Sequence, residues 1–153
     1  MKPTVYLETT IIGYLAMRLS RDLLVAANQQ LTRDWWDNHR HKYEPVISPF
    51  VIDECLKGDP TAAQERQTFL NELQLIDLPL DFKPLAEALL SRIPIPKKAE
   101  YDALHIAAAA VNSVEYLLTW TARTSPIQPY AVRSIPLAET WDLNHRSSAR
   151  RRS

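Results

Sequence analysis

Three carboxylates stand where an α/β protein could use them for chemistry. Glu8 comes directly after the short apolar run Thr4–Leu7. Glu54 lies a few residues after a second such run, and Asp102 lies near the start of an alanine-rich segment. Carboxylates gathered at one place repel each other unless a cation neutralises them, and oxygen-only ligands favour Mg²⁺ or Mn²⁺ over zinc or copper. A divalent ion held by the three acids could activate water and stabilise charge on a phosphodiester.

Each acid also has a simpler interpretation. A carboxylate at a strand end is often a helix cap or a solvated loop residue, and Asp102 could serve only to favour the positive end of its helix dipole. Glu8 stands out because it is embedded in apolar sequence. The spacing of the three acids alone does not decide between these interpretations.

Alternating apolar patterns predict the elements that would bring the acids together. Strands are expected at Thr4–Leu7, Pro45–Phe50, Leu73–Leu78 and Val114–Trp120. Helices are expected near Ile11–Met17, from a Ser20 cap to about Trp35, at Val51–Lys57, from Asp59 to about Leu73, and at Asp81–Ser91 and Lys97–Asn112. This alternation is typical of an α/β fold with a mainly parallel sheet. Ligands bind beyond the carboxyl ends of such strands, which is where the three acids are expected.

Other polar residues are weaker candidates. His105 lies one turn after Asp102, where it could hydrogen-bond that acid or contact substrate, although a histidine that packs between helices is the more common case. Thr9 is a further candidate for substrate contact. Ser48 lacks a matched His–Asp set for nucleophilic hydrolysis. Because the chain contains only two glycines, phosphate-binding loops such as the P-loop are excluded.

Length and composition favour a single cytoplasmic domain. The chain has 153 residues and a formal net charge of zero, which excludes a strongly basic nucleic-acid wrapper. Its single cysteine, Cys55, cannot form an internal disulfide, as expected for a reducing compartment. We expect no membrane span and no signal peptide, because no apolar run approaches the required length.

The charge is unevenly distributed along the chain. Residues 1–120 contain 12 basic and 16 acidic side chains, net −4, whereas residues 121–153 contain six Arg and two acids, net +4. The second segment also carries five Ser and three Pro. We expect a domain over 1–120 and an atypical, partly disordered tail over 121–153, with the Arg/Ser-rich end Arg146–Ser153 disordered.

Three sequence blocks resemble the PIN-domain family, and more narrowly the VapC-type toxins of bacterial toxin–antitoxin pairs. These are VYLETTIIGYL, VIDECLKGDP and AEYDALHIAAAAVNSVEYLLTW, within about residues 3–120. The resemblance implies a three-layer α/β/α sandwich and a metal-dependent endoribonuclease site. It places Glu8 at the first acid, usually Asp with Glu in some branches, Glu54 at the second and Asp102 at the third. It also implies a cognate antitoxin and a homodimer.

The resemblance ends after residue 120. The family places an Asp or Asn ligand just after the strand ending TW, and here that position holds Thr121, a poor ligand. Reading residues 121–153 with one restored nucleotide before codon 121 permits an asparagine at this position, then a histidine, a helical stretch and a strand. We therefore hypothesise that the tail is out of frame and that the last strand is missing or altered. Its loss would leave the strand Val114–Trp120 with an unpaired edge.

These observations lead to alternative functions. The first is a Mg²⁺- or Mn²⁺-dependent ribonuclease toxin, weakened or inactivated by the altered C-terminus. The second is a catalytically dead remnant that only binds an antitoxin or itself. Alanine at Asp102 would separate the two, because it removes cleavage and leaves partner binding largely intact. A hydrolase of small phosphate esters also fits the acids but lacks an obvious nucleophile at the first strand end.

Overall fold

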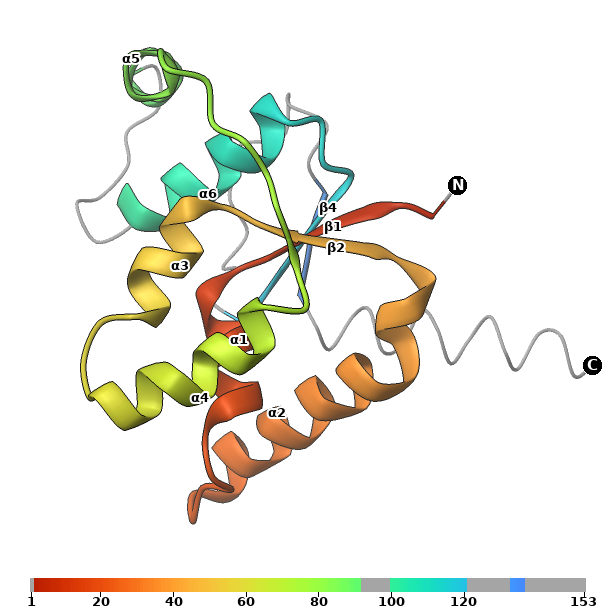
Figure 1. The fold of residues 1–153 in the computed structure, drawn as a ribbon. Coiled ribbons are helices and arrows are strands. Elements are labelled where there is room, and N and C mark those ends of the chain that lie inside the picture. Colours follow the sequence, from red (N-terminus) through yellow and green to blue (C-terminus); the bar gives the residue numbers. More distant parts are fainter. Residues whose placement is uncertain (1, 92–99, 121–132, 137–153) are drawn as a thin grey trace, which may run out of the picture.

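A computed structural model describes residues 2–91, 100–120 and 133–136, and shows a five-stranded parallel sheet (Figure 1). The strand order is β3-β2-β1-β4-β5. The strands are β1 (Thr4–Leu7), β2 (Glu44–Ile47), β3 (Gln74–Leu75), β4 (Tyr116–Thr119) and β5 (Arg133–Pro136). The central strand β1 pairs in parallel with β2 on one side and with β4 on the other. The predicted parallel α/β class is confirmed.

Helices cover both faces of the sheet. They are α1 (Thr9–Ala16), α2 (Leu23–Asp34), α3 (Pro49–Cys55), α4 (Pro60–Leu70), α5 (Phe82–Leu90) and α6 (Glu100–Val111). Figure 1 shows α5 and α6 on one side of the strands and α1, α2 and α4 on the other. This is the three-layer α/β/α sandwich expected from the sequence.

Several helix starts follow local sequence signals. The side chain of Asp59 accepts a hydrogen bond from the amide of Ala62, and Pro60 occupies the first turn of α4. Gly58, just before this cap, has φ +90°, a backbone conformation that glycine adopts without strain. The expected Ser20 cap of α2 is wrong. Asp22 caps this helix instead, while the Ser20 hydroxyl accepts from the Asp22 amide.

Element boundaries differ from the sequence-based expectations at several ends, for example where β4 spans Tyr116–Thr119 rather than Val114–Trp120. Strand β2 ends at Ile47, because Pro49 already opens α3. Strand β3 has only two residues, although an apolar strand over Leu73–Leu78 was expected. After α2 the chain continues as a π-helical turn, Trp35–His39, which buries both Trp35 and Trp36.

The core is centred on β1. Val5, Tyr6 and Leu7 are each at most 2% exposed, and Leu117 and Leu118 of β4 are buried beside them. A central strand covered on both faces leaves no position for a solvated side chain, which explains its continuous apolar character. In the part of the chain that the structure describes, no helix is long and apolar enough to cross a membrane.

The edge beyond β4 corrects one expectation. Arg133–Pro136 pairs in parallel with β4 along its whole length, so β4 does not have the unpaired edge that a lost last strand would leave. A strand ending in proline is compatible with this outermost position, because proline cannot donate to a ladder hydrogen bond. The expected disorder of Arg146–Ser153 lies outside the described residues.

Candidate functional site

Glu8 is fixed at the carboxyl end of β1 by its neighbours. It is 6% exposed and caps α1, with Oε2 accepting from the amide of Thr10 at 3.1 Å and from the Thr10 hydroxyl at 2.5 Å. The Thr119 hydroxyl at the end of β4 donates to the same Oε2 at 2.9 Å. Because these three hydrogen bonds all end on Oε2, Oε1 of the carboxylate takes part in none of them.

Glu54 is held by a histidine of helix α6. It lies in the last turn of α3, and its Oε1 is 2.6 Å from Nε2 of His105 in α6. The Glu54 side chain is 25% exposed, whereas that of His105 is 1% exposed. A buried imidazole therefore anchors a carboxylate whose other oxygen, Oε2, is not used in this contact.

The histidine continues a buried polar chain toward β1. Its Nδ1 is 2.5 Å from the phenol oxygen of Tyr6, which is 2.6 Å from the Ser48 hydroxyl. One arrangement of protons satisfies every contact when Glu54 is ionised: Nε2–H donates to Glu54, the Tyr6 hydroxyl donates to Nδ1, and the Ser48 hydroxyl donates to Tyr6. The four residues thus link β1, the start of α3 and α6.

The two carboxylates act on the same buried groups. Burial raises the pKa of the Tyr6 phenol well above its usual range, a hydrogen bond from Ser48 opposes this, and the charges of Glu8 and Glu54 raise it further. Burial likewise raises the pKa of the Cys55 thiol to about 12, and both glutamates contribute in the same direction. Tyr6 is therefore within the electrostatic reach of both acids, as expected if they share one site.

The third acid is placed only by its backbone. Asp102 lies in the first turn of α6, one turn before His105, and its side chain is outside the described part of the structure. Thr121, the position of the departed fourth ligand, also lies outside the described residues. Among the side chains that are described, no group of three or more His, Cys, Asp and Glu is arranged to hold a metal ion.

His105 uses both of its ring nitrogens within the described residues, for Tyr6 and for Glu54. The side chain of Asp102 is outside the described part of the structure, so a contact between His105 and that acid stays a prediction. The ring is 1% exposed, and the predicted contact with substrate likewise stays a prediction. The Thr9 hydroxyl, the other candidate for substrate contact, is a buried oxygen with no hydrogen-bond partner in the described structure.

Sequence reasoning missed the residues that orient the acids. In the sequence, Tyr6 resembles an ordinary aromatic residue of an apolar strand, and Thr10 and Thr119 resemble ordinary β-branched residues with no specific role. The signal in the sequence was the two-residue period of a strand. Tyr6 and Glu8 are two residues apart, so their side chains point to the same face. Only the fold reveals that His105 and Ser48 meet that phenol.

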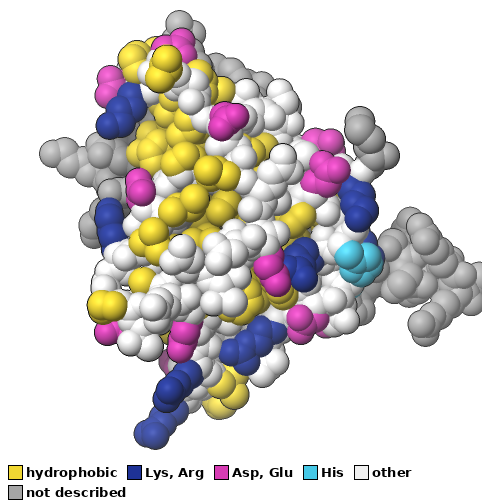
Figure 2. Space-filling view, in the orientation of Figure 1, with side chains coloured by type: hydrophobic (Ala, Val, Ile, Leu, Met, Phe, Trp, Pro, Cys, Tyr) yellow, Lys and Arg dark blue, Asp and Glu magenta, His cyan; other side chains and the backbone are white. Residues whose placement is uncertain are grey.

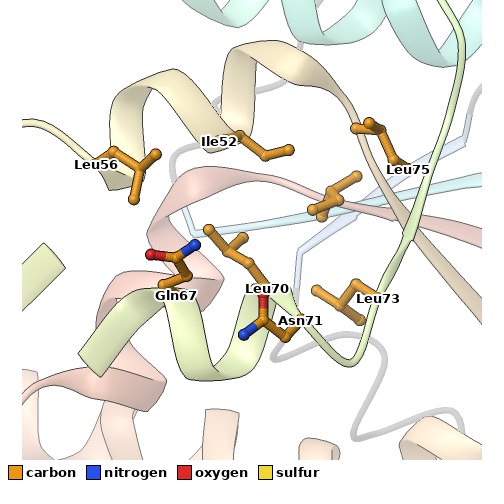
Figure 3. A pocket seen from close by; sticks show the side chains of 8 residues that line it. Ile52, Leu56, Gln67, Leu70, Asn71, Leu73 and Leu75 are labelled. Atoms are coloured by element: carbon orange, nitrogen blue, oxygen red, sulfur yellow. The ribbon is translucent and has the colours of Figure 1, made fainter. Parts of the chain in front are cut away.

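A pocket with polar and apolar lining residues lies apart from Glu8 and Glu54. It has a volume of about 240 Å³, and neither of these two acids is among its described lining residues. Figure 3 shows the side chains of α3, α4 and β3 that surround it, among them Ile52, Leu70 and Leu75. Figure 2 shows hydrophobic side chains gathered on the face of the molecule that carries α3 and α5. Among the exposed large hydrophobic residues, Leu56 is 44% exposed, Leu75 is 48% exposed and Leu80 is fully exposed.

Cys55 provides a direct check of the buried environment beside Glu54. With a pKa of about 12 and no exposed surface, the thiol is almost entirely protonated at pH 8, where an ordinary cysteine is about one quarter thiolate. We expect the folded chain to react with a thiol reagent at pH 8 at least about 100-fold more slowly than the chain in 6 M guanidinium chloride. Because the chain has one cysteine, the signal is unambiguous. Equal rates would show that the site is open.

Comparison with known proteins shows what this fold resembles. No protein-family model matches the sequence, and no curated protein matches it. A solved structure does: a chain in the crystal structure of VapBC2 from Rickettsia felis bound to a DNA fragment from their promoter. The match has a TM-score of 0.56 at 17% sequence identity and covers 87% of this chain and 98% of that chain. At this identity the likeness shows the fold alone: this chain has a parallel α/β sandwich like that of the matched chain in the VapBC2 structure.

Proposed function

We propose that the chain is a VapC-type toxin whose PIN domain is a metal-dependent endoribonuclease, impaired by its altered C-terminus. The observations that carry this proposal are a buried Glu8 at the carboxyl end of β1 and a Glu54 held through His105 to Tyr6 of the same strand, in a fold like that of the VapBC2 chain. Two partly or fully buried carboxylates so placed are unfavourable together unless a cation neutralises them. Asp102, in the first turn of the adjacent helix α6, supplies the third acid.

The donor set fits Mg²⁺ or Mn²⁺. Among the described residues, the Glu8 side chain accepts hydrogen bonds at Oε2 and Glu54 meets His105 at Oε1, so we propose that the second oxygen of each carboxylate faces the cation. Hard divalent cations prefer oxygen ligands and are commonly bound through a few carboxylates plus water. Glu8, Glu54 and Asp102 would hold the ion, which would supply a polarised water and stabilise negative charge at the scissile phosphodiester.

The surrounding residues orient these ligands. Thr10 and Thr119 hold the Glu8 carboxylate with hydrogen bonds from two hydroxyls and one amide, and Thr10 also accepts from the Trp120 amide at 3.2 Å. The proposed ligand at the end of β1 is therefore fixed by the start of α1 and by the end of the neighbouring strand β4 before any substrate binds.

Protein partners form part of the same proposal. The solved neighbour belongs to a VapBC2 complex, which supports an antitoxin as the cognate partner of this chain, and we propose a homodimer as its assembly. The exposed leucines Leu56, Leu75 and Leu80 are consistent with a protein-binding surface of this kind.

A second candidate function is a catalytically dead remnant that binds only an antitoxin or a second copy of itself. The observation favouring it is Thr121, which offers a hydroxyl where the family has a carboxylate or an amide. Such a chain would keep the buried scaffold of the site without turnover.

Metal removal distinguishes these functions. We expect the purified chain to cut single-stranded RNA with Mn²⁺ or Mg²⁺, more slowly than an intact toxin, and to lose all cleavage in excess EDTA, because three acids without a cation cannot activate water. The measurement is RNA cleavage on a denaturing gel, with p-nitrophenyl phosphate as the control for a small-ester hydrolase. Mn²⁺ binding without RNA cleavage would assign the second candidate function. Cleavage unaffected by EDTA would contradict both.

A further inference from the structure

We infer that His105 is a positioning residue for the proposed metal site: its Nε2–H fixes the Glu54 carboxylate, and Tyr6 with Ser48 fixes the imidazole. This inference rests on the proposed function, because it concerns how one of the three acids is presented to the cation. It assigns a role to a histidine that does not itself reach substrate or metal.

The first support is the difference in burial between Glu54 and His105. Glu54 lies near the C-terminal end of a seven-residue helix, with a quarter of its side chain exposed, so the fold alone leaves its three side-chain torsions free to rotate. His105 is almost fully buried and contacts the ring of Phe50, 6.5 Å between centroids, at the start of the same helix. The histidine is therefore the rigid member, and Glu54 is the member that gains order.

The second support is that the ring cannot turn without losing hydrogen bonds. Tyr6 also packs edge-on against the imidazole, with ring centroids 5.6 Å apart. Flipping the ring would remove Nδ1 from the phenol and Nε2 from the carboxylate, leaving two buried polar groups unsatisfied. The geometry fits a phenol that donates to Nδ1 and an Nε2–H that donates to Glu54, which satisfies both ring nitrogens at once.

The third support is the position of the chain in the fold. Tyr6 belongs to the central strand β1, Ser48 comes just before α3, and His105 belongs to α6. The contacts thus tie the helix that carries Glu54 to the strand whose end carries Glu8. Outer hydrogen bonds of this kind commonly contribute about 10–100-fold to metal affinity by holding a ligand in its binding geometry.

A matched pair of variants tests this role. In His105→Gln, the longer amide reaches the position of Nε2 and can donate to Glu54, while the partner of Tyr6 is lost. In His105→Asn, the shorter amide reaches the position of Nδ1, so the Tyr6 contact survives and Glu54 loses its donor. Both variants disturb the same buried site, so thermal unfolding of each controls for a general loss of structure.

The primary measurement is Mn²⁺ affinity in the absence of RNA, by isothermal titration calorimetry or by electron paramagnetic resonance of free Mn²⁺. We expect His105→Asn to weaken binding about 10–100-fold and His105→Gln to stay within about threefold of the unmodified chain. Tyr6→Phe serves as a milder third variant, with an intermediate loss. In the unmodified chain, ¹⁵N NMR is expected to show a proton on Nε2 of His105.

The outcomes separate the inference from the proposed function. If the unmodified chain binds Mn²⁺ through its acids and both variants bind it equally well, or equally poorly, His105 is not a positioning residue and the metal site stands. An Nδ1–H tautomer would overturn the inference independently of any metal. If the unmodified chain binds no Mn²⁺, the proposed function fails and the inference fails with it, although the tautomer would still report the hydrogen-bond chain.

Discussion

Glu54→Gln is expected to lower metal-dependent RNA cleavage by about 100-fold or more, a loss of about 2.7 kcal/mol in transition-state stabilisation. The amide keeps the shape of the side chain, and its carbonyl oxygen can still accept from Nε2 of His105 at the place of Oε1. What the substitution removes is the negative charge and one good cation ligand. The measurement is the rate of RNA cleavage as a function of Mn²⁺ concentration.

The neighbouring acid provides a matched control. Asp53 is exposed on the same helix, one residue before Glu54 and directed away from the buried chain. Asp53→Asn removes the same negative charge from the neighbouring position of α3, and it is expected to change the cleavage rate by less than about twofold. Equal losses in the two variants would show that the net charge of α3, and not a ligand at Glu54, supports cleavage. No loss in either would remove Glu54 from the site.

Much of the fold could be predicted from the sequence, because local signals and the tertiary structure agree. The strand Thr4–Leu7 is found with the expected bounds, and the Asp59 cap begins α4 as expected. The errors arise where tertiary packing decides. Trp35 and Trp36 are buried by a π-helical turn that no periodicity indicates, and β3 shrinks to two residues because only those pair with β2.

The candidate site was predictable in part, and the limit has a physical cause. In a parallel sheet the carboxyl ends of the strands lie at the same edge, so Glu8 and the helix that carries Glu54 are expected to lie at that edge. Hydrogen bonds between residues 99 positions apart, such as Tyr6 to His105, depend on register and helix rotation, which the sequence pattern does not specify. The predicted metal ligation by Glu8, Glu54 and Asp102 stays a prediction.

Leu118→Ala is expected to lower the free energy of unfolding by about 2–5 kcal/mol, a large fraction of the 5–15 kcal/mol typical of a small domain. Leu118 is 2% exposed in β4, lies opposite Leu7 of the central strand, and its carbonyl accepts from the Glu8 amide at 3.1 Å. Truncation there leaves a cavity that the paired backbones on both sides prevent from closing. The measurement is urea unfolding, with a lower midpoint at an unchanged slope.

Leu75→Ala is the matched control, because it makes the same truncation in an edge strand of the sheet instead of an inner strand. Leu75 lies in the edge strand β3 and is 48% exposed, so its loss removes less contact and leaves a surface that solvent can fill. We expect it to cost less than about 1 kcal/mol. Equal losses would contradict a core centred on β1 and β4. Because Leu118 also holds the backbone of Glu8, a smaller loss of stability accompanied by weaker Mn²⁺ binding would show that this strand serves the site more than the core.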